Sequence, residues 1–180
     1  MGKVRGTNKK PMHRTPLLSA LFLLVGLAVG IPAQAQEEPR VYALTRIDRD
    51  FMEEQRAAVD DLARTYLGRQ VRRQKDNDLE VLQQLLDRRA VKPDKTVLLQ
   101  AMGVVLGDLL SDELNMPWVI YEDRLGRSRA LRAGTSDEYL FPVTMISRRA
   151  EVGAGVNVRE IFDKSVELMK PHLPPRPFDY

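Results

Sequence analysis

The sequence predicts a single α+β domain, in which about four helices pack with a small antiparallel sheet of about three strands. Apolar residues recur with helical spacing between residues 51 and 110, and again between residues 161 and 169. Between these segments, residues 118–146 are rich in β-branched and aromatic residues and contain turn signals. Helices that flank a group of strands, and do not alternate with them, favour the α+β class.

The N-terminal segment has the features of a signal peptide. Five basic residues precede an apolar run from Leu17 to Ile31, and Ala33-Gln34-Ala35 places small residues where a signal peptidase requires them. This run of 15 residues is shorter than the ~20 residues that span a bilayer. We therefore expect cleavage after Ala35 and a periplasmic or secreted mature protein, with an uncleaved membrane anchor as the alternative.

The charge and the cysteine content narrow the classes of function. Removal of residues 1–35 leaves 23 Lys and Arg against 25 Asp and Glu, so the mature chain has a net charge near −2. We therefore expect no nucleic-acid partner, and contact with a membrane only through the signal peptide before its cleavage. The chain has no cysteine, which excludes disulfides and thiol chemistry, so packing must stabilise the fold.

The chain after the signal peptide divides into three expected parts. We expect a polar leader at 36–47, one α+β domain at 48–173 and an extended Pro-rich tail at 174–180. A mature chain of 145 residues can bury about two-thirds of its unfolded surface, which is enough for one core. The tail, with Phe178 and Tyr180 near its end, either docks back on the domain or is offered to a partner.

Capping and spacing signals place the first three helices. Asp50 and Glu53 have capping-box spacing, and the apolar pattern that follows them ends near Gly68, a residue that favours a helix C-terminus. The leucines of residues 79–86 predict a second, shorter helix. Pro93-Asp94 then opens a third helix.

Two glycines in the third predicted helix indicate a close packing contact. Gly103 and Gly107 lie one turn apart on one face, although each glycine costs about 1 kcal/mol relative to alanine in a helix interior. A close neighbour is therefore expected on that face. It is either a helix or strand packed against bare backbone, or a ligand.

The segment WVIYEDRLGRSRALRAG predicts a β-hairpin. Its first four residues, from Trp118, favour a strand, and residues 123–126 supply a turn that contains glycine. The arginine-bearing second half then returns antiparallel to the first. Because side chains alternate along a strand, Arg127 and Arg129 lie on one face of it.

A third strand and a last helix complete the predicted domain. Residues 139–146 favour a strand, and Pro142 places this strand at an edge or a bulge of the sheet. Asn157 and Glu160 have capping-box spacing and open a helix, which Pro171 ends.

Four stretches together resemble a known group of bacterial proteins. They read GVVLGD, WVIYEDRLGRSRALRAG, EYLFPVTMISRRAEVG and IFDKSVELMKPHLPP. In this combination the chain resembles exported bacterial proteins of the domain-of-unknown-function 3806 family over nearly the whole mature sequence. The resemblance implies a fold and an export route. It implies no activity and brings no catalytic residue to this chain.

The mature chain offers little catalytic equipment. His172 is its one histidine and no cysteine is present, so we expect no Ser–His–Asp site, no metal site and no cofactor. A carboxylate-dependent site is the remaining route, with Glu122, Asp108 and Asp137 as candidate acid and base groups. The balance leans against an enzyme.

The arginine-rich β region is the best candidate binding site. Eighteen of the 23 basic residues after position 35 are arginine, whose guanidinium suits carboxylates and phosphates and stacks on aromatic rings. The candidate binding residues are Trp118, Tyr121, Arg127, Arg129, Arg132, Arg148 and Arg149. The alternative is internal, with Trp118 as a core anchor and the arginines paired across neighbouring strands. The acidic partners would then be Glu122, Asp123, Asp137 and Glu151.

We interpret the chain as an exported, non-enzymatic interaction protein. It would bind an acidic protein surface or an anionic envelope ligand through the arginine-bearing sheet. Two alternatives stay open: a carboxylate-dependent hydrolase or transferase of the envelope, and an immunity-type inhibitor of a periplasmic toxin. The sequence carries no prediction of the oligomeric state.

Overall fold

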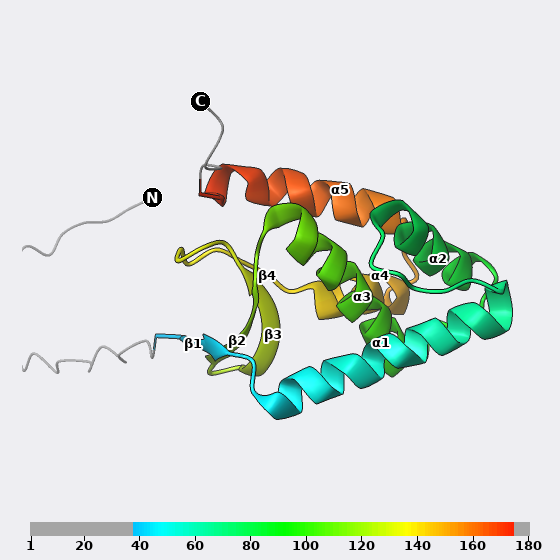
Figure 1. Cartoon of the computed structure of the whole chain (residues 1–180), viewed down its shortest axis with the longest axis horizontal. Coiled ribbons are helices and arrows are strands. Elements are labelled where there is room, and N and C mark those ends of the chain that lie inside the picture. The colour runs from blue at the N-terminus through cyan, green and yellow to red at the C-terminus, as the bar shows by residue number, and fades with distance from the viewer. Residues whose placement is uncertain (1–37, 175–180) are drawn as a thin grey trace, which may run out of the picture. The chain divides into compact units, whose positions relative to one another are not determined.

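The computed structural model describes residues 38–174, which form an α+β domain. In this range five α-helices lie on one side of a four-stranded antiparallel sheet with the strand order β1-β2-β3-β4 (Figure 1). The fold class is as predicted, with one helix and one strand more than expected. The elements are β1 (Arg40–Ala43), α1 (Arg46–Leu67), α2 (Lys75–Asp87), α3 (Thr96–Leu114), β2 (Trp118–Asp123), β3 (Gly126–Arg132), β4 (Tyr139–Leu140), α4 (Met145–Glu151) and α5 (Val158–Met169), with short 3-10 helices at Pro142–Thr144 and Lys170–His172.

Several predictions for the ends of the chain lie outside the described residues. These are the signal peptide, its cleavage after Ala35 and residues 175–180 of the Pro-rich tail. Pro174, the first residue of that tail, lies beside Gly134 in the turn between β3 and β4. In the part of the chain that the structure describes, no helix has both the length and the apolar character needed to cross a bilayer.

Strand β1 occupies part of the segment that we expected to be a polar leader. It pairs antiparallel with β2, so that Arg40 lies opposite Glu122 and Ala43 lies opposite Val119. A four-residue strand has almost no periodic signal of its own, and its hydrogen bonds depend on a partner far along the chain. Residues 40–43 of the predicted polar leader therefore belong to the sheet.

Helix α1 begins earlier than its predicted cap at Asp50. Thr45 is the N-cap, its side chain accepts a hydrogen bond from the Asp48 amide, and the Asp48 carboxylate accepts one from the Thr45 amide. This reciprocal capping box satisfies backbone donors that the first turn leaves free. The predicted end is confirmed, because Gly68 follows the helix in the left-handed region with φ 63°.

Helices α2 and α3 form where the leucine spacing predicted them. Helix α3 runs between α1 and α5 (Figure 1), and every residue from 101 to 110 is buried. A helix that is enclosed by neighbours must be apolar around its whole circumference. This explains the sequence GVVLGDLL, in which Asp108 is the one charged residue.

The close neighbours predicted for Gly103 and Gly107 belong to the same domain: the 3-10 turn at Pro142–Thr144 and Trp118 of β2. A Cβ atom on Gly103 would lie 2.7 Å from the Pro142 carbonyl oxygen and would also overlap the backbone of Val143. A Cβ atom on Gly107 would overlap the indole ring of Trp118. Bare backbone at both positions therefore lets α3 approach β2 and the chain after β4.

The predicted hairpin is confirmed as β2 and β3. The turn contains Gly126 at φ 125°, and the Asp123 carboxylate accepts a hydrogen bond of 2.8 Å from the Leu125 amide. Across the hairpin Ile120 lies opposite Arg129. On this face Ile120 and Leu131 are fully buried, whereas Arg127 and Arg129 continue the face towards the first turn of α1.

The prediction of a third strand over residues 139–146 is wrong beyond Leu140. Only Tyr139–Leu140 pairs with β3, and the chain then forms a 3-10 turn and helix α4. Pro142 is the first residue of that turn, where a missing amide hydrogen costs nothing and the fixed φ suits a helical turn. The β-branched and aromatic residues around Pro142 favour a strand, but they suit a buried turn equally well, so residue type alone did not distinguish the two.

The last helix, α5, has the cap predicted for it. The Asn157 side chain accepts a hydrogen bond of 3.0 Å from the Glu160 amide. Pro171 follows in the 3-10 turn that ends the helix.

Candidate functional site

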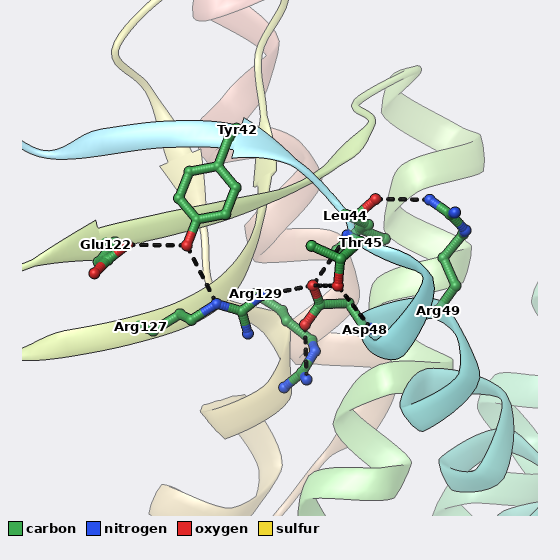
Figure 2. Close-up of polar contacts among 8 residues, drawn as sticks. All are labelled: Tyr42, Leu44, Thr45, Asp48, Arg49, Glu122, Arg127 and Arg129. Atoms are coloured by element: carbon green, nitrogen blue, oxygen red, sulfur yellow. Dashed lines mark hydrogen bonds and ion pairs between the residues drawn. The ribbon is translucent and has the colours of Figure 1, made fainter.

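The strongest polar centre of the domain surrounds Asp48, at the start of α1. Its Oδ2 atom accepts hydrogen bonds from Arg127 Nη2 at 2.5 Å and from the Thr45 hydroxyl at 2.6 Å, and its Oδ1 atom accepts one from Arg129 Nη2 at 3.0 Å (Figure 2). Asp48 is 1% exposed. One buried carboxylate therefore joins the N-terminus of α1 to strand β3.

A second chain of contacts extends this centre across the sheet. Arg127 Nε donates to the Tyr42 hydroxyl at 3.3 Å, and that hydroxyl donates to Glu122 Oε2 at 2.9 Å (Figure 2). Arg40 Nη2 donates to Glu122 Oε1 at 3.1 Å. These contacts connect β1, β2 and β3, which are adjacent strands.

Arg127, with Thr45, stabilises the charged form of Asp48. The hydrogen bond from Arg127 holds the pKa of the Asp48 carboxyl well below its ordinary value, and the Thr45 hydrogen bonds act in the same direction against the opposing effect of burial. The same pair raises the pKa of Arg127. Asp48 is therefore ionised over the physiological pH range, and it acts as a fixed anchor and not as an acid or base.

The outer side of this centre is partly apolar. The guanidinium carbon of Arg129 lies 4.2 Å from the centre of the Phe51 ring, and that of Arg127 lies 6.0 Å from the centre of the Tyr42 ring. Tyr42 and Phe51 are 37% and 39% exposed, and Ile47, one turn before Phe51, is 79% exposed. We call these five residues the arginine–aromatic surface.

This surface has unused capacity to bind an anion. An arginine has five N–H donors. Among the described residues Arg127 uses Nε and Nη2 and Arg129 uses Nη2, while Arg129 Nε is buried without a partner, so the Nη1 group of each arginine forms no hydrogen bond. Both guanidiniums share the single negative charge of Asp48. Arg49 directly follows Asp48 in the helix and donates to the Leu44 carbonyl, not to an acid. Positive charge is therefore in excess around the first turn of α1.

Sequence reasoning missed Asp48 as the partner of the arginines. The acids expected to pair with them were Glu122, Asp123, Asp137 and Glu151. Of these, Asp137 pairs with Arg132 at 3.5 Å, as the internal alternative predicted. Glu122 pairs instead with Arg40, and Glu151 accepts a hydrogen bond from Thr96. The spacing of Thr45 and Asp48 is a capping-box signal that could have placed a carboxylate at the start of this helix.

The arginine cluster predicted around the sheet is smaller than expected. Arg132 donates to the Ser136 and Thr135 carbonyls at 2.7 and 2.9 Å, which closes the turn before β4. Arg148 and Arg149 belong to helix α4 and not to a strand, and Arg149 donates to the Met145 carbonyl. Only Arg127 and Arg129 converge on a shared centre.

The aromatic candidates Trp118 and Tyr121 lie on opposite faces of β2. Trp118 packs on Gly107, and its indole Nε1 donates to Asp108 Oδ1 at 3.0 Å. Tyr121 makes edge contacts with Tyr139 and Phe141, at centroid distances of 4.9 and 5.4 Å. Neither ring contributes to the arginine–aromatic surface.

The three candidate catalytic carboxylates are not brought together. Asp108 is buried and accepts two hydrogen bonds from Arg56, at 2.6 and 3.0 Å, besides that from Trp118. Glu122 is held by Arg40 and Tyr42 as described above, and the Asp137 side chain is 96% exposed. An acid/base pair built from these residues has no geometric support. Among residues 38–174 no group of three His, Asp or Glu side chains is arranged to hold a metal ion.

A comparison with family models decides the relationship of the chain to known proteins. The model for a domain of unknown function (DUF3806) matches residues 78–162. The chain belongs to this family. The matched part of the family domain runs from α2 into α5 and includes the whole hairpin, whereas β1 and Asp48 precede it. Because the family is defined by a domain of unknown function, membership assigns no activity to any residue.

A solved structure shows the same fold. The crystal structure of a protein from Bacteroides thetaiotaomicron VPI-5482, at 1.50 Å resolution, is similar with a TM-score of 0.67 and 17% sequence identity. The similarity covers 74% of this chain and 49% of that chain, so this chain matches about half the length of its structural neighbour. At this identity the likeness concerns the fold alone. No curated protein matches the sequence.

Proposed function

We propose that the protein is an exported, non-enzymatic binding protein, and that its arginine–aromatic surface recognises an acidic surface of a partner protein. One observation carries this proposal: two partly exposed guanidiniums share one buried carboxylate and lie beside the exposed rings of Tyr42 and Phe51, with exposed Ile47 one helical turn before Phe51. Arginine and aromatic residues are enriched at the energetic centres of protein interfaces. Export is proposed from the basic and apolar N-terminal sequence.

The apolar part of the surface favours a protein over a phosphate-bearing envelope molecule. Ile47 is 79% exposed and lies one helical turn from Phe51, whose ring is itself 39% exposed. Single exposed apolar side chains are common, but a group of them beside uncommitted guanidinium donors suits a partner with both carboxylate and apolar side chains. A periplasmic toxin blocked by this protein would be one partner of this chemistry.

A pair of matched substitutions tests the proposal. Ile47 and Val97 are both β-branched, exposed, and second residues of their helices, α1 and α3. Aspartate in the first turn of a helix is favourable, so Ile47→Asp and Val97→Asp should both stay folded. We expect Ile47→Asp to reduce capture of the partner at least about tenfold, because it adds negative charge and removes apolar area, and Val97→Asp to leave capture unchanged.

The measurement is chemical crosslinking in intact cells that express the full chain with its N-terminal signal sequence, followed by pull-down and quantitative mass spectrometry. The proposal requires a partner whose yield falls with Ile47→Asp and not with Val97→Asp. Equal yields of every crosslinked protein from both variants would contradict it. Turnover of a substrate by the purified protein would contradict its non-enzymatic part.

A further inference from the structure

A second region of the domain combines a pocket with unsatisfied polar groups. The pocket, of ≈ 550 Å³, is bounded by α1, α3, the first turn of α2 and the loop at 71–73. Its apolar wall includes Val71, Val105 and Leu109. It is separate from the arginine–aromatic surface, and the inference below does not rest on the proposed function.

Most charged groups around this pocket already have partners. Asp108 is neutralised by Arg56, as described above. Arg73 makes two hydrogen bonds to Asp112, at 2.6 and 2.8 Å. Asp60 pairs with Arg64 at 2.6 Å and accepts a hydrogen bond from the Val71 amide. The lining residues whose charged side chains still have hydrogen-bonding groups without a partner are Asp78 and Arg72.

Asp78 is fully buried, and its two oxygens differ sharply. Oδ1 accepts hydrogen bonds from the Arg72 amide at 3.0 Å and from Asn77 Nδ2 at 2.7 Å. Oδ2 is closed off from solvent and has no hydrogen-bond partner within residues 38–174. Burying a carboxylate oxygen without a hydrogen-bond donor costs free energy, and native proteins rarely contain such an unsatisfied buried oxygen. The pocket wall therefore contains an unused acceptor of a hydrogen-bond-donating cation.

Arg72 supplies the opposite charge next to this carboxylate. Its amide is bound to Asp78 Oδ1, which fixes the two residues relative to each other. Its side chain is exposed, and the guanidinium forms no hydrogen bond or ion pair with any described residue. The next residue, Arg73, has φ 57°, a strained value for a residue other than glycine. Because Asp78 Oδ2 is closed off from solvent in this structure, a ligand would reach it only through a movement of this loop.

We propose that this pocket binds a small zwitterion, namely an α-amino acid with an apolar side chain. Its ammonium group would donate to Asp78 Oδ2, its carboxylate would pair with the Arg72 guanidinium, and its side chain would lie on Val71, Val105 and Leu109. The two charged groups of an α-amino acid are close together, and Asp78 and Arg72, whose amide binds Asp78 Oδ1, both line this pocket. The apolar wall distinguishes such a ligand from a simple salt.

The sole tryptophan of the chain provides a readout of binding. Trp118 donates to Asp108, which lines the pocket, so its fluorescence should respond when the pocket is filled. We expect saturable binding of L-leucine by the purified mature protein, measured by this fluorescence and by calorimetry. N-acetyl-L-leucine, which lacks the ammonium, and leucinol, which lacks the carboxylate, should each bind at least about tenfold more weakly.

Three variants locate the site. Asp78→Asn keeps the Oδ1 acceptor that holds the loop but removes the charge, and it should weaken L-leucine binding by about 10- to 100-fold. Arg72→Gln changes an exposed side chain and should weaken binding about tenfold or more. Asp61→Asn is the matched control, because Asp61 is an exposed carboxylate on α1, and its binding should equal that of the wild type.

The outcomes separate clearly. Loss of binding in the first two variants with an unchanged melting curve supports the site, and Arg72→Gln serves alone if Asp78→Asn fails to fold. Absence of any response to L-leucine up to roughly 10 mM overturns the proposal, since this is weaker than the 1 mM end of ordinary affinities. Equal binding of N-acetyl-L-leucine, or full binding by Arg72→Gln, also overturns it.

Discussion

Asp48→Ala should lower the free energy of unfolding by about 3 kcal/mol, because it leaves two arginines without their shared carboxylate and removes half of the α1 capping box. Asp48 is 1% exposed and accepts hydrogen bonds from Thr45, Arg127 and Arg129. Loss of one partner from a buried ionic group costs more than loss of an exposed pair, since the remaining charges stay poorly solvated. Urea unfolding followed by circular dichroism measures the change.

Asp50→Ala is the control for this substitution. Asp50 lies in the same helix but is exposed, and it forms one ion pair of 3.6 Å, with Arg46. Its removal should change the free energy of unfolding by less than about 0.5 kcal/mol. If Asp48→Ala and Asp50→Ala were equally stable, the Asp48 centre would not be holding α1 to the sheet.

The contribution of Asp48 should also depend on pH. Its folded-state pKa is lowered, chiefly by Arg127, so the unfolded chain takes up this proton before the folded one does. The stabilisation is therefore complete above the ordinary carboxyl pKa of about 3.9 and is lost as the pH falls below it towards the folded value. The stability difference between the wild type and Asp48→Ala should stay constant from about pH 7 to 5 and shrink below about pH 4. A difference that does not change with pH would contradict this assignment.

Gly103→Ala should destabilise the protein by about 2 kcal/mol, although alanine is the better helix former by about 1 kcal/mol. The added Cβ would lie 2.7 Å from the Pro142 carbonyl oxygen and closer still to that of Val143. Both neighbours are backbone atoms of the 3-10 turn, so they cannot move away as a flexible side chain can. Relief requires that α3 and this turn separate, which opens the core.

Gly155→Ala is the matched control for the glycine prediction. A Cβ atom on Gly155 would meet nothing within 4 Å, and its φ is not positive. We expect its stability to stay within about 0.5 kcal/mol of the wild type in the same urea experiment. A Gly103→Ala protein as stable as the wild type would show that the close approach at α3 is not required.

Helix ends and turns were predictable where a single residue at the boundary has a strong backbone or capping preference. Gly68 ends α1, Asn157 caps α5, and Gly126 allows the hairpin turn. Gly103 and Gly107 likewise indicated a close contact before the contacting residues were known. In each case a backbone preference of one or two residues decides the outcome, and such a preference acts without reference to the rest of the chain.

Elements that depend on distant partners were not predictable. Strand β1 has four residues and exists through its pairing with β2, 76 to 82 positions away in the sequence. The residues around Pro142 suit a strand or a buried turn equally, and packing of this segment on Gly103 selected the turn. Sequence-based expectation therefore undercounted the strands and extended β4.

The same distinction between local signals and distant partners applies to the candidate site. The sequence alone predicted recognition in preference to catalysis, from many arginines in a β region and, after residue 35, one histidine and no cysteine. Tertiary structure alone decided that Arg127 and Arg129 share Asp48, that Arg148 and Arg149 lie elsewhere, and that the three candidate carboxylates stay apart. The physical reason is that residue type and spacing determine the local backbone preference and the charges that are present. Which charged side chains form pairs depends on which of them the tertiary packing brings close together.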